Sequence, residues 1–189
     1  PDEEPPEEEP PEEDPPEREP PEDEIPYADQ FDTVVRAVDA GADPEGNEPV
    51  NSLFREHSEP NTLFAFDAGT YRFEPFQVSN RSVGIVGIGD ENPQFVPTEG
   101  GCRGGNPYYF FEKINDLVVD SIDFDFRDSD AGGPLHLFLE GDSTIKDVSY
   151  LGACGNQIGI ARIEVHDPEG SAHVENFEAT NVAGDNSLT

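Results

Sequence analysis

The aspartates in the middle of the chain are the strongest candidates for chemistry in this sequence. Asp123 and Asp125 alternate with Phe124 and Phe126, so on a β-strand both carboxylates point to one side. Two carboxylates about 7 Å apart, with Asp128 close behind, could hold Ca²⁺ with water and backbone oxygens, or serve as the acid and base of glycoside cleavage. A solvated acidic face is the simpler alternative. Of the two functional hypotheses we favour calcium, with Asp123, Asp125 and Asp128 as its ligands.

One aromatic run could stack on sugar rings. Alternation along a strand would place Tyr108 and Phe110 on one face and Tyr109 and Phe111 on the other. An aromatic face turned outward is a good platform for a sugar, whereas a stack of rings inside the fold is the more common use. We take Tyr108, Tyr109 and Arg127 as candidate carbohydrate-binding residues.

Two cysteines are candidates for a disulfide. Cys102 and Cys154 both lie among glycines or other small residues, and two cysteines in an exported protein are consistent with one bridge. Two inert buried thiols are the alternative. Catalysis through either thiol would require a matched histidine, and the sequence gives no sign of one.

Other common site motifs are missing. The four histidines, His57, His136, His166 and His173, have no metal-ligand spacing, so we expect structural or surface roles. The glycine series between residues 84 and 89 is not followed by a helical pattern, which argues against a dinucleotide-binding fingerprint. The sequence has neither a phosphate-binding loop nor a nucleophile elbow.

The charge of the chain narrows the possible partners. Its 189 residues hold 43 acidic and 10 basic side chains, a net charge of −33, which would repel nucleic acid over the whole surface. Residues 27–189 alone carry 29 acidic and nine basic residues. Molar salt shortens the Debye length to about 3 Å and removes most of this self-repulsion, so we favour a halophilic origin. A calcium-loaded or simply acidic extracellular domain is the alternative.

The first 26 residues differ from the rest in composition. Proline pairs alternate with runs of acidic residues, and such a segment has too little apolar surface to offset the entropy of ordering. We expect a disordered, extended stalk over residues 1–26, which would join the domain to a lipid or cell-wall anchor. No apolar run approaches the roughly 18 residues of a membrane span, and no leader pattern is present.

The region after residue 27 predicts a short helix between turns and strands. Val50, Leu53 and Phe54 share one face of a helix predicted over residues 49–57. A Gly-Ala-Asp-Pro-Glu-Gly turn precedes it at residues 41–46. Strands are predicted over residues 62–66 and 70–73.

This order of elements, continued by the glycine-rich strand at residues 83–89, resembles the N-terminal region of pectate-lyase-like β-helix proteins. The resemblance implies that the helix caps the first coil of a solenoid. It does not select an activity, because lyases, hydrolases, epimerases and non-enzymatic adhesins share this region.

The enzymes of that superfamily imply specific signatures. Lyases typically use an arginine base beside calcium held by acidic residues, and after residue 110 the only arginines are Arg127 and Arg162. Neither lies in a motif that matches. The polygalacturonase signatures Asn-x-Asp, Asp-Asp, Gly-His-Gly and Arg-x-Lys are all missing.

A repeated phrase supports coils independently of the resemblance. The pattern apolar, polar, polar, apolar begins at Val119, Ile145 and Val174, with spacings of 26 and 29 residues, within the range of solenoid repeats. No Asn-Gly or Asp-Gly pair is present to form a tight hairpin. We therefore predict an all-β, right-handed parallel β-helix with a short N-terminal capping helix. An antiparallel sandwich is the alternative.

The segment before Thr189 has no closing helix, and an open solenoid end leaves backbone groups unpaired. We therefore expect residues 27–189 to be N-terminal coils whose natural chain continues, or whose end a partner closes.

The predicted function is an extracellular or cell-surface module that binds polysaccharide or surface glycoprotein, or has a structural role. The alternative is the N-terminal part of a polysaccharide lyase or glycoside hydrolase, which clustered aspartates and an arginine in later coils would indicate.

Overall fold

The computed structural model describes most of the chain from residue 25 onward. All structural statements below concern this part, which comprises residues 25–74, 76–79, 81–98, 109–127, 135–152 and 161–180. None of its helices is long and apolar enough to cross a membrane.

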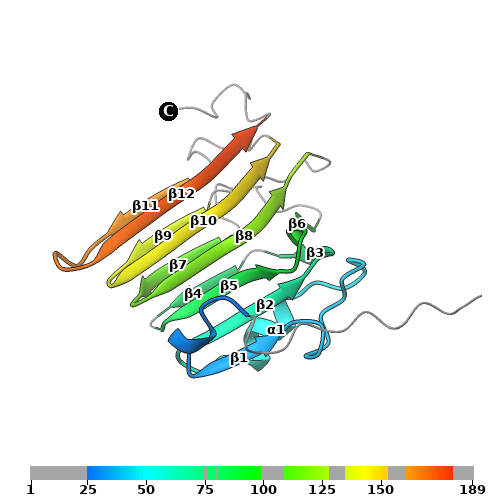
Figure 1. The fold of residues 1–189 in the computed structure, drawn as a ribbon, viewed down its shortest axis with the longest axis horizontal. Helices are drawn as coiled ribbons and strands as arrows, with labels where there is room; N and C mark the ends of the chain where they lie inside the picture. The colour runs from blue at the N-terminus through cyan, green and yellow to red at the C-terminus, as the bar shows by residue number, and fades with distance from the viewer. Residues whose placement is uncertain are drawn as a thin grey trace, which may run out of the picture.

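The described residues form a β-solenoid of about four turns, with the capping helix at one end and the last strand at the other (Figure 1). Every strand pairing found among them is parallel, so the parallel solenoid is confirmed and the antiparallel sandwich is wrong.

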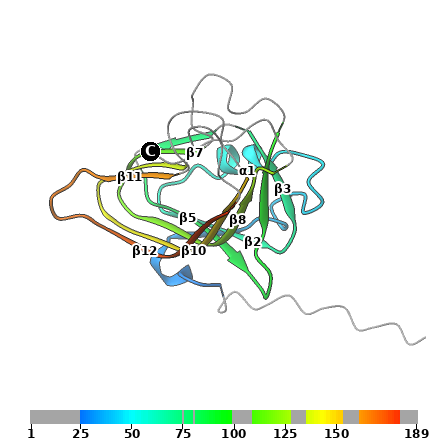
Figure 2. The ribbon, with the colours of Figure 1, turned by 90° about the horizontal axis from the view of Figure 1, so that it is seen from above.

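Two sheets run the length of the solenoid on opposite sides, as the view along its axis shows (Figure 2). Sheet A contains, in order across the sheet, β1 (Thr33–Arg36), β2 (Thr62–Asp67), β5 (Val83–Ile88), β8 (Leu117–Asp125), β10 (Asp142–Leu151) and β12 (Ser171–Thr180), with β3 (Thr70–Phe73) and β6 (Gln94–Pro97) attached at its side. Sheet B contains β4 (Phe76–Ser79), β7 (Tyr109–Ile114), β9 (Leu135–Leu139) and β11 (Ala161–Val165).

The repeated phrase stacks as predicted. Val119 pairs with Ile145 and Ile145 with Val174, and the second apolar positions pair in the same way. Val119 and Ile145 are buried, whereas Val174 on the last described strand is 45% exposed. Among the described residues β12 has a strand neighbour on one side only, so its inward side chains lack a covering layer.

A left-handed residue explains how two apolar positions three residues apart can both face inward. In a regular strand they would point to opposite sides. The residue before the second apolar position has positive φ in three successive coils: 57° at Ser121, 49° at Asp147 and 50° at Asn176. Gly87 lies beside this column, where an added Cβ would lie 2.2 Å from the Ser121 carbonyl oxygen. The bend therefore requires a glycine in the coil below.

Aromatic rings fill one side of the interior. Phe66, Phe95 and Phe124 come from three successive coils, and their neighbouring ring centroids lie 4.9 and 6.0 Å apart. Phe126 continues the stack to Tyr150 at 5.0 Å. Contacts of this kind add to the area buried by each ring.

The predicted capping helix is present as α1 (Asn51–Glu56). Val50, Leu53 and Phe54 are buried as the periodicity indicated. Phe54 packs edge to face on Phe64 of β2, with the ring centroids 4.8 Å apart. The helix thus closes the interior of the first coil.

The N-terminal segment packs on the outer face of sheet A. Ile25 and Phe31, on either side of the 3₁₀ helix η2 (Ala28–Gln30), are buried together with Val86 and Val118. We call residues 25–31 the strap. Ile25 thus belongs to the packed domain rather than to the stalk predicted over residues 1–26, of which residues 1–24 lie outside the described part.

Candidate functional site

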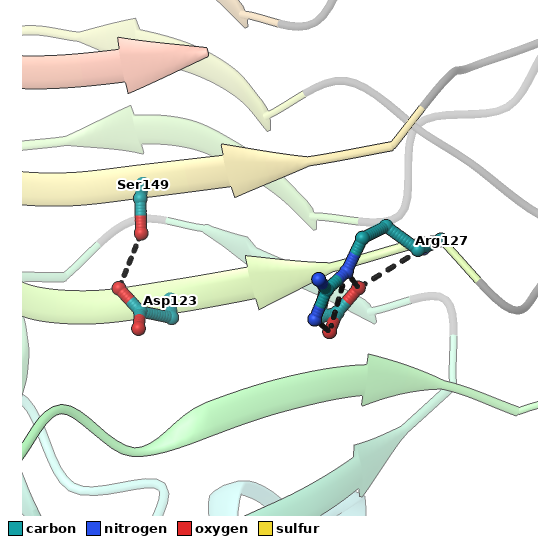
Figure 3. A network of polar contacts seen from close by, with 4 residues as sticks. Asp123, Arg127 and Ser149 are labelled. Carbon is teal, nitrogen blue, oxygen red and sulfur yellow. Dashed lines mark hydrogen bonds and ion pairs between the residues drawn. The ribbon is translucent and has the colours of Figure 1, made fainter. Parts of the chain in front are cut away.

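The structure confirms the predicted orientation of the aspartates on β8. Phe124 and Phe126 are buried in the core, and Asp123 and Asp125 lie on the outer face of sheet A. Asp123 accepts a hydrogen bond from the Ser149 hydroxyl on β10 (Figure 3). It also accepts one from Asn92 Nδ2 at 3.1 Å. It therefore links neighbouring coils.

Asp125 is held by a different partner. Arg127 Nη2 donates to Asp125 Oδ2 at 2.6 Å and its Nε to Oδ1 at 3.0 Å, while the Arg127 backbone N–H also donates to Oδ1 at 3.0 Å (Figure 3). Hydrogen bonding to the Arg127 side chain lowers the pKa of Asp125. Asp123 and Asp125 thus share a face but have separate partners.

Arg127 also limits what the predicted calcium ligands can do together. Both carboxylate oxygens of Asp125 already accept from it, so a cation would have to compete with a bidentate ion pair. Nowhere in the described ranges do three or more His, Cys, Asp or Glu side chains form a group that could hold a metal ion. Asp128 lies outside those ranges, and the calcium site stays a prediction.

Several other predicted residues also lie outside the described part. These are Tyr108 and both disulfide candidates, Cys102 and Cys154. Tyr109 begins β7 of sheet B, but its side chain is not described. Arg127, the remaining carbohydrate-binding candidate, is half exposed beside Asp125.

The structure brings together a second group of side chains, on the outer face of sheet B. Strands β9 and β11 pair in parallel, so that His136 faces Arg162 and Phe138 faces Glu164. The intervening Leu137 and Leu139 are buried in the core. The alternate residues therefore project outward, away from the interior.

Phe138 lies at the centre of this group. The ring of His166, just beyond β11, lies 5.4 Å from the Phe138 ring centroid at an interplanar angle of 22°. His136 lies 6.3 Å away on the other side, and the Arg162 guanidinium carbon lies 5.7 Å from the Phe138 centroid. We call Phe138, His136, Arg162, Glu164 and His166 the sheet B cluster.

Glu164 connects the two polar side chains nearest the ring. One of its carboxylate oxygens pairs with Arg162 Nε, and the other lies 3.1 Å from His166 Nε2. The hydrogen bond with His166, together with the charge of Arg162, lowers the pKa of Glu164. Burial and the charge of Arg162 lower the pKa of His136 below its ordinary value near 6.5. At neutral pH Glu164 is therefore ionised and His136 uncharged.

The sequence carries a partial signal for this cluster. His136 and Phe138 alternate with leucines, and Arg162, Glu164 and His166 are spaced by two, so each set shares a strand face. From spacing alone we expect structural or surface roles for these histidines, and Arg162 lies in no motif that matches. What brings the two sets together is the pairing of β9 with β11, which their separate alternations do not reveal.

The comparisons with known proteins add no assignment. No protein-family model matches the chain, and the searches of curated proteins and of solved structures find no match either. The parallel β-solenoid is a finding of the structure, while the pectate-lyase-like family remains a resemblance in the sequence.

Proposed function

We propose that this protein is an extracellular or cell-surface module that binds polysaccharide or glycoprotein glycans on the outer face of sheet B. The observation that carries the proposal is Phe138, a partly exposed ring on an outward strand face with Arg162, Glu164 and His166 around it. Small-molecule sites combine apolar surface with a few well-placed polar groups. A sugar presents the complementary surface, with C–H groups on its face and hydroxyls at its rim.

The solenoid supports this function in two ways. Its parallel strands repeat at about 4.8 Å, so neighbouring coils can supply contacts to a ligand that extends along the axis. Phe110 of β7, rather than Tyr109, is in register with His136 of the cluster, so the neighbouring coil also carries an aromatic residue at that register position. The resemblance to pectate-lyase-like proteins, a superfamily that acts largely on polysaccharides, supports the same class of ligand.

The environment that we propose is outside the cell and rich in salt. The acidic surface of the domain supports a halophilic archaeal source, and the acidic, proline-rich residues 1–26 support a stalk that holds the domain away from an anchor. The alternative of a lyase or hydrolase gains no support from the described residues. Arg127 and Arg162 are both paired with carboxylates, and this keeps a guanidinium charged rather than basic.

The test is calorimetric titration of the full chain with a panel of polysaccharides and glycoprotein glycans in multimolar KCl. We expect at least one to bind, and the Phe138→Ala variant to bind it at least ten times more weakly. Val174→Ala is the matched control, because it also truncates an exposed apolar side chain but on β12 of sheet A. The proposal fails if no glycan binds or if the two variants bind equally well.

A further inference from the structure

We propose that the sheet B cluster takes uncharged sugars and discriminates against uronates and other acidic sugars. This inference rests on the proposed glycan-binding function and specifies its ligand class. It follows from the contacts that the Arg162 guanidinium already makes within the cluster.

The cation of the cluster already has a partner on its own strand. Glu164 pairs with Arg162 through one carboxylate oxygen and contacts His166 through the other. A ligand carboxylate would have to use the terminal nitrogens of Arg162, whose charge is already offset by the pair with Glu164. It would also meet the negative charge of Glu164, whose lowered pKa keeps it ionised.

The surroundings add repulsion. Exposed Asp167 and Glu169 occupy the turn that follows β11, and exposed Glu140 lies at the end of β9. The net charge of residues 27–189, with 29 acidic and nine basic side chains, has the same sign. Salt screens the repulsion from these more distant charges within a few ångströms. A ligand carboxylate in contact with Glu164 lies too close for salt to screen their repulsion. Discrimination at high salt therefore comes from Glu164.

An uncharged sugar meets none of these obstacles. Its C–H face can lie on the partly exposed Phe138 ring. Arg162 has five N–H donors, of which Nε is used by Glu164, so its terminal groups can donate to hydroxyl oxygens. The ionised Glu164 can in turn accept from a hydroxyl.

The experiment compares matched ligands that differ only in charge. Oligosaccharides of three polyuronates, each paired with its carboxyl-reduced counterpart, are titrated into the full chain alongside neutral glucan, galactan and xylan oligosaccharides, all in 3 M KCl. We expect neutral sugars to bind, and any reduced oligosaccharide that binds to do so at least ten times more tightly than its parent uronate. Glu164→Gln should strengthen uronate binding and so reduce the ratio between the affinity for a reduced oligosaccharide and the affinity for its parent uronate. Glu178→Gln removes an equal charge from β12 of sheet A and should leave the ratio unchanged.

The outcomes distinguish the preference for uncharged sugars from the glycan-binding function on which it rests. Uronates that bind as tightly as their reduced forms, or a ratio that Glu164→Gln leaves unchanged, would overturn the inference while glycan binding stands. Absence of binding to every sugar would overturn both. Circular dichroism of each variant shows whether the solenoid is intact, and a Glu164→Ala variant provides a second removal of the charge if the glutamine variant misfolds.

Discussion

The Asn176 side-chain amide donates a hydrogen bond of 2.7 Å to Asp147 Oδ1 in the coil below. Both residues occupy the left-handed region, with φ of 50° and 49°. The contact therefore joins two equivalent bends, at the position where each coil turns a second apolar side chain inward. Asparagine and aspartate accept this conformation more readily than branched residues do.

Replacing Asn176 should show how much the left-handed conformation at this bend affects the free energy of unfolding. Asn176→Val places a β-branched residue at positive φ and should lower the free energy of unfolding by about 1–2 kcal/mol for the backbone alone. Asn176→Gly also loses the amide contact but accepts the conformation, so it should be the milder change. Urea unfolding at constant salt measures both. Equal losses in the two variants would show that the bend carries no strain.

The strap should depend on one buried hydrogen bond. The Tyr27 hydroxyl donates to Asp120 Oδ2 at 2.6 Å, and Asp120 is only 7% exposed. Burial, and then the bond to Asp120, raise the pKa of Tyr27, so it stays protonated as a donor. Tyr27→Phe leaves this carboxylate short of a donor and should weaken strap docking by about 1–3 kcal/mol.

Hydrogen exchange measures that effect locally. Amides of residues 25–31 should lose protection in Tyr27→Phe, while those of β10 keep theirs. Adding Asp120→Asn should restore part of the loss, because it removes a buried charge that has lost its Tyr27 donor and, among the described residues, keeps only the Ser121 hydroxyl. Uniform loss of protection across both segments would show that the strap does not open as a separate unit.

The ion pair on β8 should contribute to the pH dependence of stability. Arg127 lowers the pKa of Asp125 in the folded state, below the ordinary aspartate value near 3.9. The contribution is therefore fully present above about pH 4 and is lost as the pH falls through the lowered folded pKa. Asp125→Asn should flatten the acid limb of a stability profile measured between pH 2 and 6. Asp90→Asn, which removes an exposed carboxylate in a turn, serves as the control and should change that limb less.

Salt should stabilise the whole domain. With 29 acidic and nine basic residues after residue 26, self-repulsion is strong at low ionic strength and is screened as the Debye length falls from about 10 Å at 0.1 M to 3 Å at 1 M. The β signal in circular dichroism should weaken when KCl is dialysed away. Unfolding midpoints should rise with KCl, and less steeply in Asp90→Asn/Glu91→Gln. A fold indifferent to salt would contradict the proposed halophilic adaptation.

The sequence predicts the coils better than the surfaces they present. The phrases beginning at Val119 and Ile145 repeat because each coil must fill the same interior, so their stacking is visible in one sequence. The left-handed φ of Ser121 cannot be predicted from the sequence, because serine has no special preference for that conformation. The packing of the strap cannot be predicted either, because Ile25 is an isolated apolar residue among charged and proline residues.

The predicted site shows the same limit. Alternation correctly places Asp123 and Asp125 on one face, but it cannot show that Arg127 folds back onto Asp125, which depends on rotamers. The sheet B cluster depends on which residue of β11 faces Phe138, and the repeated phrase of sheet A, with spacings of both 26 and 29 residues, leaves that register open.

The most direct test of glycan binding on sheet B is whether a bound sugar touches Phe138. The chain carrying ring-protonated phenylalanine in a deuterated background is titrated with the best neutral oligosaccharide, and nuclear Overhauser effects are recorded, with Phe138→Leu identifying the Phe138 signals. We predict contacts between the Phe138 ring protons and one face of a single sugar ring, together with loss of affinity in Phe138→Leu. Binding that gives no such contacts and is unaffected by that substitution would contradict glycan binding at Phe138.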